Sequence, residues 1–258
     1  MNEKNNFYNQ EYFQRRDNLP LHLAKTIELV LKDLGVQKIL DVGCGTGKLV
    51  EFLNNTGFNA VGCDNSPWAV KISGQTKASA THLPFKSYSF DCVTAIGLIE
   101  HLSPKEANKF FEETRRVLKP KGYFFIATPN SSSIRRFLKG KKWFAYSDPT
   151  HIVFYSPNSL KKILEKHQFG NFRLTFKTNL GVAADWKPSF TSLPKVIQFM
   201  FNLILISSPL ICLRDSFWIL CQKRSYMPFN STCAFQPGGL NTFKPTTTST
   251  KAYQKDRL

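Results

Sequence analysis

Apolar residues in the first half of the chain alternate between helical spacing and short continuous runs. Over 21–34 they recur every three or four positions, which predicts an amphipathic helix that Gly35 ends. An apolar run over 38–42 follows, and segments of both kinds then succeed one another. This alternation predicts an α/β fold, in which a parallel sheet has helices on both faces. Ligands of such folds bind outside the carboxyl ends of the strands.

The remaining elements are bounded by caps and by residues that break helices. Ser66 is a suitable N-cap, and Ser103, with Glu106 three residues later, has the pattern of a capping box. The helix that Ser103 begins should end before the breaking segment 119–122. We expect further strands at 60–63, 91–96, 123–127, 172–178 and 217–222, and further helices at 47–54, from 66 towards 74, and from Ser156 or Asn158 to about Gly170.

A glycine-rich turn joins the first strand to the next helix. Gly43, Gly45 and Gly47 alternate there, which lets the backbone bend sharply and lets a ligand approach where no Cβ intrudes. A dinucleotide site would need a third glycine at the position that Lys48 occupies. Asp64 ends the second strand, and its carboxylate can accept two hydrogen bonds from a ribose diol. Together they predict a site for a cofactor that contains a nucleoside.

This turn is one of several motifs that together resemble the class I S-adenosylmethionine-dependent methyltransferases, in particular the ubiquinone and menaquinone methyltransferase group. The resemblance covers about 8–223 and is carried by 40–47, Asp64, 82–85 with 89–91, 99–102, 117–120 with Gly122, and 148–151 with 154–157. It implies S-adenosylmethionine as the cofactor and methyl transfer as the reaction. It also implies a doubly wound, Rossmann-like, mostly parallel seven-stranded sheet with helices on both faces and an antiparallel last strand.

The resemblance also assigns the contacts to the cofactor. Asp41 and the glycine turn would line its methionine part, Asp64 would hold the ribose hydroxyls, and Asn65 would lie beside the adenine. Many relatives have an aspartate at the adenine edge, where Ser79 and Ala80 stand in this chain. Ile96, the last residue of the strand predicted at 91–96, and Gly97 after it would close over the sulfonium. The expected cofactor-binding residues are therefore Asp41, Gly43, Cys44, Gly45, Gly47, Asp64, Asn65, Ser79, Ala80, Ile96 and Gly97.

His151 is the best candidate for a general base, which methyl transfer needs only when the acceptor must lose a proton. The alternative is a histidine that fastens a loop by hydrogen bonding. In the ubiquinone O-methyltransferases a Glu-x-x-Glu-His run binds a divalent metal, but here Gly97 takes its first position and leaves Glu100 and His101. Two ligands seldom hold a divalent cation alone. We therefore expect no metal site and a structural role for His101.

Composition and resemblance divide the chain into parts. Tyr8, Tyr12 and Phe13 are spaced to fold over the cofactor, as in relatives, and a frayed start is the alternative. The last part of the chain has little to bury, which predicts disorder. The expected parts are a cofactor-covering segment (1–19), a class I methyltransferase domain (20–224) that includes a basic substrate lid (131–150) and an apolar helix (193–213), and a disordered tail (225–258).

The chain is strongly basic, with 35 Lys and Arg against 18 Asp and Glu and a net charge of +17. Such a surface attracts anions. The lid, with basic residues beside aromatic ones, suits an anionic substrate, a lipid surface or single-stranded RNA, although the chain carries no recognised RNA-binding module. We expect a small-molecule or lipid-like acceptor and favour O-methylation. Peripheral contact with an anionic membrane, binding of nucleic acid, and a non-catalytic membrane- or RNA-binding role for the same fold are the alternatives.

The six cysteines are scattered and show no CxxC spacing, which suits a reducing compartment. The start of the chain lacks the apolar run of a signal peptide, so we expect a cytoplasmic protein. The apolar stretch 196–213 contains several polar residues. We expect it to pack on the domain, and a helix at the membrane interface is the alternative.

Overall fold

The computed structural model describes residues 7–16, 19–174, 194, 197, 212 and 214–225. The chain divides into two compact units, Met1–Ser225 and Tyr226–Leu258, and every described residue belongs to the first. The predicted tail, apart from its first residue, lies outside the described residues, and so does almost all of the predicted apolar helix. In the described part of the chain, no helix combines the length and the apolar character that crossing a membrane requires.

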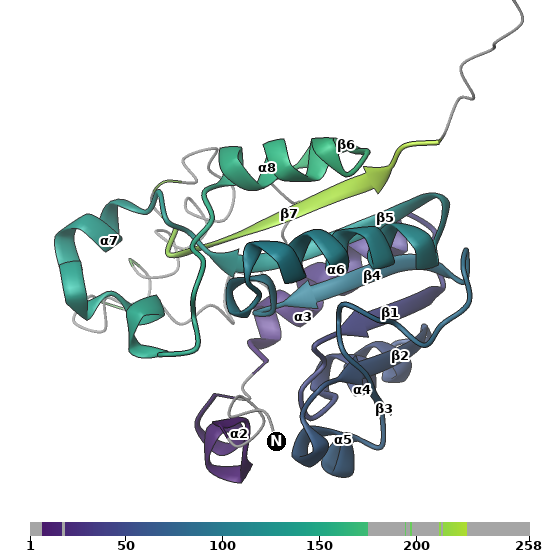
Figure 1. Cartoon of the computed structure of the whole chain (residues 1–258), viewed down its shortest axis with the longest axis horizontal. Helices are drawn as coiled ribbons and strands as arrows, with labels where there is room; N and C mark the ends of the chain where they lie inside the picture. Colours follow the sequence, from purple (N-terminus) through teal and green to yellow (C-terminus); the bar gives the residue numbers. More distant parts are fainter. Residues whose placement is uncertain are drawn as a thin grey trace, which may run out of the picture. The chain divides into compact units, whose positions relative to one another are not determined.

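Seven described strands form one sheet. They are β1 (Lys38–Val42), β2 (Asn59–Asp64), β3 (Thr76–Lys77), β4 (Phe90–Ile96), β5 (Leu118–Pro129), β6 (Phe169–Arg173) and β7 (Ser216–Lys223). Their order in the sheet is β3-β2-β1-β4-β5-β7-β6 (Figure 1). The pairs from β3 to β5 are parallel, whereas β7 runs antiparallel to both of its neighbours. The predicted mostly parallel seven-stranded sheet with an antiparallel last strand is confirmed.

Helices cover both faces of this sheet, with α6 in front and α3 behind in Figure 1. The described helices are α2 (Gln10–Arg16), α3 (Leu21–Asp33), α4 (Lys48–Asn55), α5 (Pro67–Ser73), α6 (Pro104–Val117), α7 (Ile134–Lys139) and α8 (Pro157–Lys166), with short 3-10 helices η1 (Ile99–His101), η2 (Gly140–Lys142) and η3 (Phe144–Ser147). Successive strand residues point to opposite faces. Leu40 and Phe124 therefore share a core with α6 and α8, whereas Ile39 and Phe125 share one with α3 and α4.

The predicted helix starts are confirmed by their hydrogen bonds. The hydroxyl of Ser66 accepts the amide of Ala69 at 3.3 Å. Ser103 and Glu106 form the predicted capping box, in which the Ser103 amide donates to the Glu106 carboxylate at 2.8 Å. Ser156, rather than Asn158, caps α8. These caps satisfy amide groups that the first helical turn leaves without partners.

Three predicted boundaries are wrong, one of them the start of the strand expected at 172–178, because β6 already begins at Phe169. The segment 119–122 was expected only to break a helix, yet β5 already begins at Leu118 and runs through it. The helix expected to reach Gly170 ends at Lys166, because Gln168 adopts a left-handed conformation (φ 61°) and turns the chain into β6. A glycine would be the usual residue for that turn, so the pattern of glycines misplaced it. The residues 175–178 of the predicted strand lie outside the described part of the chain.

Candidate functional site

The candidate site lies where three neighbouring parallel strands end. β1 pairs with β2 on one side and with β4 on the other (Figure 1). The glycine turn (43–47) follows β1, Asp64 and Asn65 stand at the end of β2, and Ile96 ends β4. Gly97 then turns the chain with φ of 63°, and its amide donates to a carbonyl of β5 at 2.9 Å. The structure therefore brings these predicted residues to one edge of the sheet, where open α/β sheets bind ligands.

The glycine turn holds a backbone conformation that favours glycine at alternate positions. Gly43, Gly45 and Gly47 have φ of 73°, 54° and 81°, all in the left-handed region. A Cβ on Gly43 would lie 2.9 Å from Cδ1 of Leu98. Cys44 is buried, and its amide donates to a carbonyl of β2 at 3.1 Å. The amides of 43, 44, 45 and 47 all donate within the protein, which fixes the shape of the turn. The sharp bend that the sequence predicted is present, and close approach of a ligand to it stays a prediction.

Asp64 joins this turn to the second strand. Its Oδ2 accepts the Gly45 amide at 2.9 Å, and its Oδ1 accepts the Ser66 amide at 2.8 Å. A carboxylate offers about four lone-pair sites, more than the two that these amides use. The half-buried carboxylate is held in one orientation and can still accept hydrogen bonds from a diol.

Asp41 lies deeper under the same edge. It is buried, and its Oδ1 accepts the Thr94 hydroxyl at 2.6 Å from the neighbouring strand β4. The pKa of Asp41 is raised to about 7, mainly by burial and in smaller part by the charge of Asp64, while the bond from Thr94 lowers it. A cationic ligand group nearby would favour the ionised carboxylate. Asp41 is therefore suited to the neighbourhood of a positive charge.

On the predicted adenine side, the Ser79 hydroxyl is engaged by Thr81. Its Oγ lies 2.9 Å from the Thr81 hydroxyl and accepts the Thr81 amide at 3.2 Å. Its carbonyl accepts the His82 amide at 3.0 Å. Ser79 and Ala80 are half-buried, and Asn65 is exposed. The adenine contacts of these three residues stay predictions, with the backbone at Ala80 as the group best suited to one.

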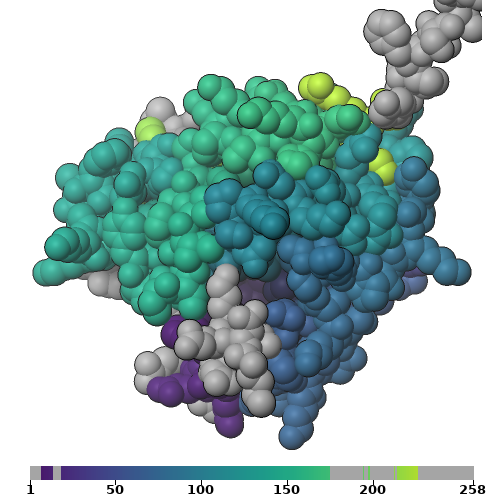
Figure 2. Space-filling view, in the orientation of Figure 1, coloured from purple at the N-terminus to yellow at the C-terminus, as the bar shows by residue number. Residues whose placement is uncertain are grey.

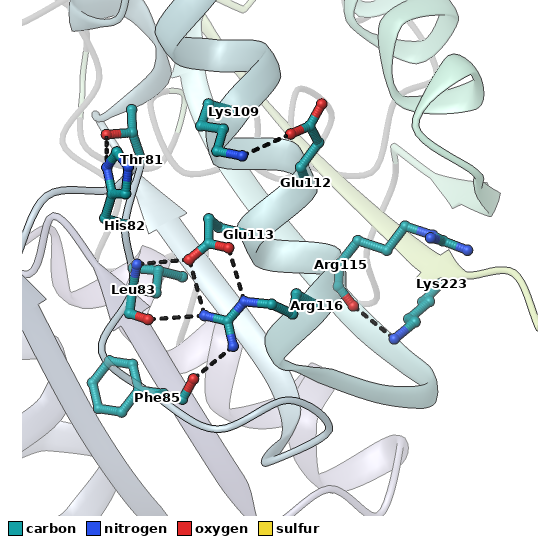
Figure 3. A network of polar contacts seen from close by, with 10 residues as sticks. All are labelled: Thr81, His82, Leu83, Phe85, Lys109, Glu112, Glu113, Arg115, Arg116 and Lys223. Carbon is teal, nitrogen blue, oxygen red and sulfur yellow. Dashed lines mark hydrogen bonds and ion pairs between the residues drawn. The ribbon is translucent and has the colours of Figure 1, made fainter.

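A network of polar contacts fastens the segment that follows to helix α6, as Figure 3 shows. Arg116 donates to the carbonyls of Phe85 and Leu83 at 2.7 and 2.8 Å and pairs with Glu113 at 2.8 Å. Glu113 in turn accepts the Leu83 amide at 2.8 Å, and its bond from Arg116 lowers the pKa of Glu113. The end of the adenine-side segment is thereby held against the domain.

A second polar cluster lies after β4. Ligand atoms of Glu100, His101 and His151 all lie within 4.8 Å of one another, and no other group of this kind is found among the residues that the structure describes. The amides of Ile152 and Val153 donate to the Glu100 carbonyl at 2.9 and 3.2 Å, which brings His151 here. Burial raises the pKa of Glu100 to about 7. The sequence did not place His151 beside Glu100 and His101, because it precedes a different helix.

His151 has one ring nitrogen engaged and one turned to an acid. Its Nδ1 lies 2.7 Å from the Ala145 carbonyl, and its Nε2 lies 3.8 Å from Oδ2 of Asp148. Because a carbonyl only accepts, Nδ1 carries the proton and the neutral ring has its lone pair on Nε2. Thr150 donates to Asp148 at 2.5 Å and contacts Nδ1 of His101 at 2.8 Å. Both roles expected for His151, a base and a loop fastener, fit this arrangement.

The described amino-terminal residues contact both the segment that follows Asp64 and the polar cluster around His101. The Ser66 hydroxyl donates to the Tyr8 carbonyl at 2.8 Å, and the Tyr8 hydroxyl lies 3.3 Å from Nδ1 of His101. The Tyr12 hydroxyl donates to Asp148 at 3.4 Å. Phe13, the third aromatic residue predicted to cover the cofactor, stacks on Trp68 of α5. Sequence reasoning gave Asp148 no role, although it stands in the motif that ends with His151.

Comparisons with known proteins agree with this arrangement. A family described as "Methyltransferase domain" matches residues 12–173. A ubiquinone biosynthesis O-methyltransferase from Bartonella tribocorum is 29% identical over 150 residues, which cover 52% of this chain and 57% of that protein. A Homo sapiens protein named "Probable tRNA methyltransferase 9B" is 36% identical over 94 residues, which cover 34% of this chain and 20% of that protein. The chain thus spans less than two thirds of these curated relatives.

A solved structure shows the same fold. It is a SAM-dependent methyltransferase from Archaeoglobus fulgidus, with 20% sequence identity and a TM-score of 0.55. The match covers 82% of this chain and 98% of that one.

Proposed function

This chain belongs to the methyltransferase-domain family, and from that premise we propose that it binds S-adenosylmethionine and transfers a methyl group to a small-molecule or lipid-like acceptor. The observation that carries the proposal is the junction of the glycine turn with Asp64. The bond between the Gly45 amide and the Asp64 carboxylate, 2.9 Å long, holds a ribose acceptor beside a backbone that a ligand can approach closely.

The other predicted contacts follow from this placement. Asp41 and the turn 43–47 would line the methionine part of the cofactor, where the buried carboxyl meets the positive charge that it favours. Ile96 and Gly97 would face the sulfur from the end of β4. Tyr8 bridges α5 and His101 and would cover the ligand from the amino-terminal side.

When bound, S-adenosylmethionine supplies an electrophilic methyl group. The chain's main contribution is to hold the acceptor in line with that group, and such positioning is worth about 7–11 kcal/mol. For an acceptor hydroxyl, Nε2 of His151 would take the proton while the methyl carbon passes from sulfur to oxygen, leaving S-adenosylhomocysteine. The Asp148 carboxylate, 3.8 Å away, then stabilises the imidazolium. This pairing supports O-methylation over transfer to an atom that needs no base.

Two observations bear on the class of acceptor: the names of the relatives and the side chains that the predicted lid exposes. One relative is named as an O-methyltransferase of ubiquinone biosynthesis and another as a tRNA methyltransferase. The small-molecule or lipid-like acceptor is favoured because the lid exposes aliphatic side chains, which suit apolar acceptors better than nucleic acid. A non-catalytic protein with this fold is the competing proposal, and the binding test below separates the two.

Calorimetry with S-adenosylhomocysteine tests cofactor binding. We expect binding by the wild-type chain and at least a hundredfold weaker binding by Asp64→Ala, because the two lost hydrogen bonds to a charged group contribute about 1.5–3 kcal/mol each. Asp64→Asn keeps one acceptor oxygen and should lose less. Circular dichroism must show that both variants are folded, since Asp64 also holds two backbone amides. No binding by wild type at millimolar ligand would remove the proposal, and an unchanged affinity of the variants would refute the ribose role.

Two variants separate the roles of His151. His151→Asn retains a donor for the Ala145 carbonyl but has no base, whereas His151→Ala loses both. If His151 is the base, both variants should lose about 10²–10⁴ in turnover of a hydroxyl acceptor that wild type methylates, with unchanged S-adenosylhomocysteine affinity. Rescue by asparagine alone would instead assign the fastening role. A chelator should leave turnover unchanged; loss that an added divalent cation restores would assign the three-residue cluster to a metal.

A further inference from the structure

Helix α7 presents a row of exposed apolar side chains. Ile134, Phe137 and Leu138 stand at positions i, i+3 and i+4, which places them on one face of the helix. They are 43%, 73% and 80% exposed, and Leu138 is the most exposed large apolar residue that the structure describes. No residue of α7 is buried. Removing such side chains from water is favourable, so this face has the chemistry of a contact surface.

Exposed positive charges border this apolar face. Lys139 ends α7, and Lys141 and Lys142 follow in η2; all three are exposed. No ion pair joins any of them to another residue in the described part of the chain. The segment 131–147 contains no aspartate or glutamate. The surface therefore combines apolar side chains with uncompensated positive charge.

The base of the same segment is held firmly. The carboxylate of Asp215, just before β7, accepts the Ser133 hydroxyl at 3.2 Å and the Trp143 indole N–H at 3.2 Å. It also pairs with Arg135 at 3.2 Å. Trp143 is 1% exposed and anchors the far end of the segment. Figure 2 shows the teal part of the chain that contains α7 standing out at the left edge. These contacts hold the two ends of the segment in place, and the apolar face of α7 between them stays exposed.

We propose that α7 and the lysines after it dock the molecule on the surface of an anionic phospholipid bilayer. Ile134, Phe137 and Leu138 would enter the boundary between headgroups and acyl chains, and the lysines would lie among the anionic headgroups. The proposal goes beyond methyl transfer and does not depend on it.

The exposed rings of Phe137, Phe144 and Tyr146 could stack on bases, but the two exposed aliphatic side chains of α7 favour lipid over RNA as the occupant. Single strands are held by basic residues together with aromatic rings on which bases stack. Leu138 and Ile134 offer no ring, and on RNA their exposed surface would stay in water. The Ala145 carbonyl that accepts Nδ1 of His151 belongs to the same segment. Docking by α7 would therefore bring the bilayer surface close to the proposed base.

Co-sedimentation of the full chain with vesicles tests this proposal. Wild type should sediment with phosphatidylcholine vesicles that contain phosphatidylglycerol, and not with phosphatidylcholine alone. Phe137→Ser with Leu138→Ser should weaken binding at least tenfold. Replacing the three lysines by glutamine should weaken it about a hundredfold at low salt, since each lysine near such a surface contributes about fivefold. Ile72→Ser, which removes an apolar side chain 58% exposed on α5, is the matched control and should change nothing.

Three results would overturn the proposal. They are no sedimentation of wild type with anionic vesicles at low salt, an equal loss in the Ile72→Ser control, and full binding by the double serine variant. The last result, together with displacement by polyuridylate, would identify a polyanion site without lipid insertion. Calorimetry with S-adenosylhomocysteine on the same variants should give wild-type affinity, so failure of docking is distinguishable from failure of cofactor binding.

Discussion

Replacing Asp41 by asparagine should change stability and cofactor binding in opposite directions. Burial raises the pKa of Asp41 from 3.8 to about 7, so the folded chain keeps a proton that the unfolded chain has already lost. Unfolding therefore releases this proton between about pH 4 and pH 7, and the folded state loses stability as the pH rises through that range. Asparagine has nearly the same shape and can accept the bond from Thr94, but it has no proton to release.

The size of the effect follows from the raised pKa. Each pH unit in this range changes the free energy of unfolding by about 1.4 kcal/mol for one proton released. From about pH 5 to pH 8, wild type should therefore lose about 3 kcal/mol more than Asp41→Asn. The pKa of Glu100 is also raised to about 7 by burial, but Glu100 titrates in both proteins and cancels in the difference. The comparison thus isolates Asp41.

Urea unfolding followed by circular dichroism, repeated across this pH range, measures the difference. Calorimetry with S-adenosylhomocysteine at the upper end should show weaker binding by Asp41→Asn, if the ionised carboxylate lies beside the positive charge of the ligand as proposed. Wild-type affinity should rise with pH to about 7 as Asp41 ionises, and the variant should lack this rise. Parallel stability curves for the two proteins would refute the reasoning, because Asp41 would then have an ordinary pKa in the fold.

Two smaller predictions test the turn and the adenine side. Gly43→Ala should lower stability by about 1–3 kcal/mol through its positive φ, since its Cβ would also lie 2.9 Å from Cδ1 of Leu98. It should also weaken S-adenosylhomocysteine binding, because a shifted turn no longer holds the backbone where the cofactor approaches it. Gly35→Ala has a similar φ of 63° but open space around it, so in thermal melts and calorimetry it should lose stability alone. Arg116→Met leaves two backbone carbonyls without their donor and should lower stability by about 1 kcal/mol and S-adenosylhomocysteine affinity several-fold. Lys109→Met, which removes an exposed ion pair, should change neither. Equal effects of the two variants would contradict the fastening role of Arg116.

The sheet and its loops could be predicted because their causes are local. The capping box at Ser103 depends on two residues one helical turn apart, and the sequence contains both. The glycine turn depends on positive φ at alternate positions, where Gly43 to Gly47 are the residues that adopt it most easily. The turn at Gln168 was missed for the same reason, since a glutamine seldom adopts a left-handed conformation and carries no signal of one.

The polar clusters could not be predicted, because residues far apart in the chain form them. His151 reaches Glu100 only because the two amides after it bond to the Glu100 carbonyl, and no spacing in the sequence encodes that contact. Asp215, which lies just before the last strand, likewise bonds to three side chains of the segment 131–147. Which residues of α7 are exposed depends on the same packing, so the sequence indicated a basic lid without its apolar face.

The candidate site and the segment 131–147, the predicted lid, have opposite electrostatic character. Asp41, Asp64, Glu100 and Asp148 stand at or beneath the carboxyl edge of a chain whose net charge is +17, whereas 131–147 holds only basic charges. The acids are buried or half-buried, so dissolved salt screens them little, and the lid lysines are exposed, so salt screens them strongly. A cation is thus favoured at the edge at any ionic strength, while attraction of the lid to an anionic surface weakens as salt rises. A rise in salt should therefore detach the chain from an anionic surface without weakening its attraction for a positively charged cofactor.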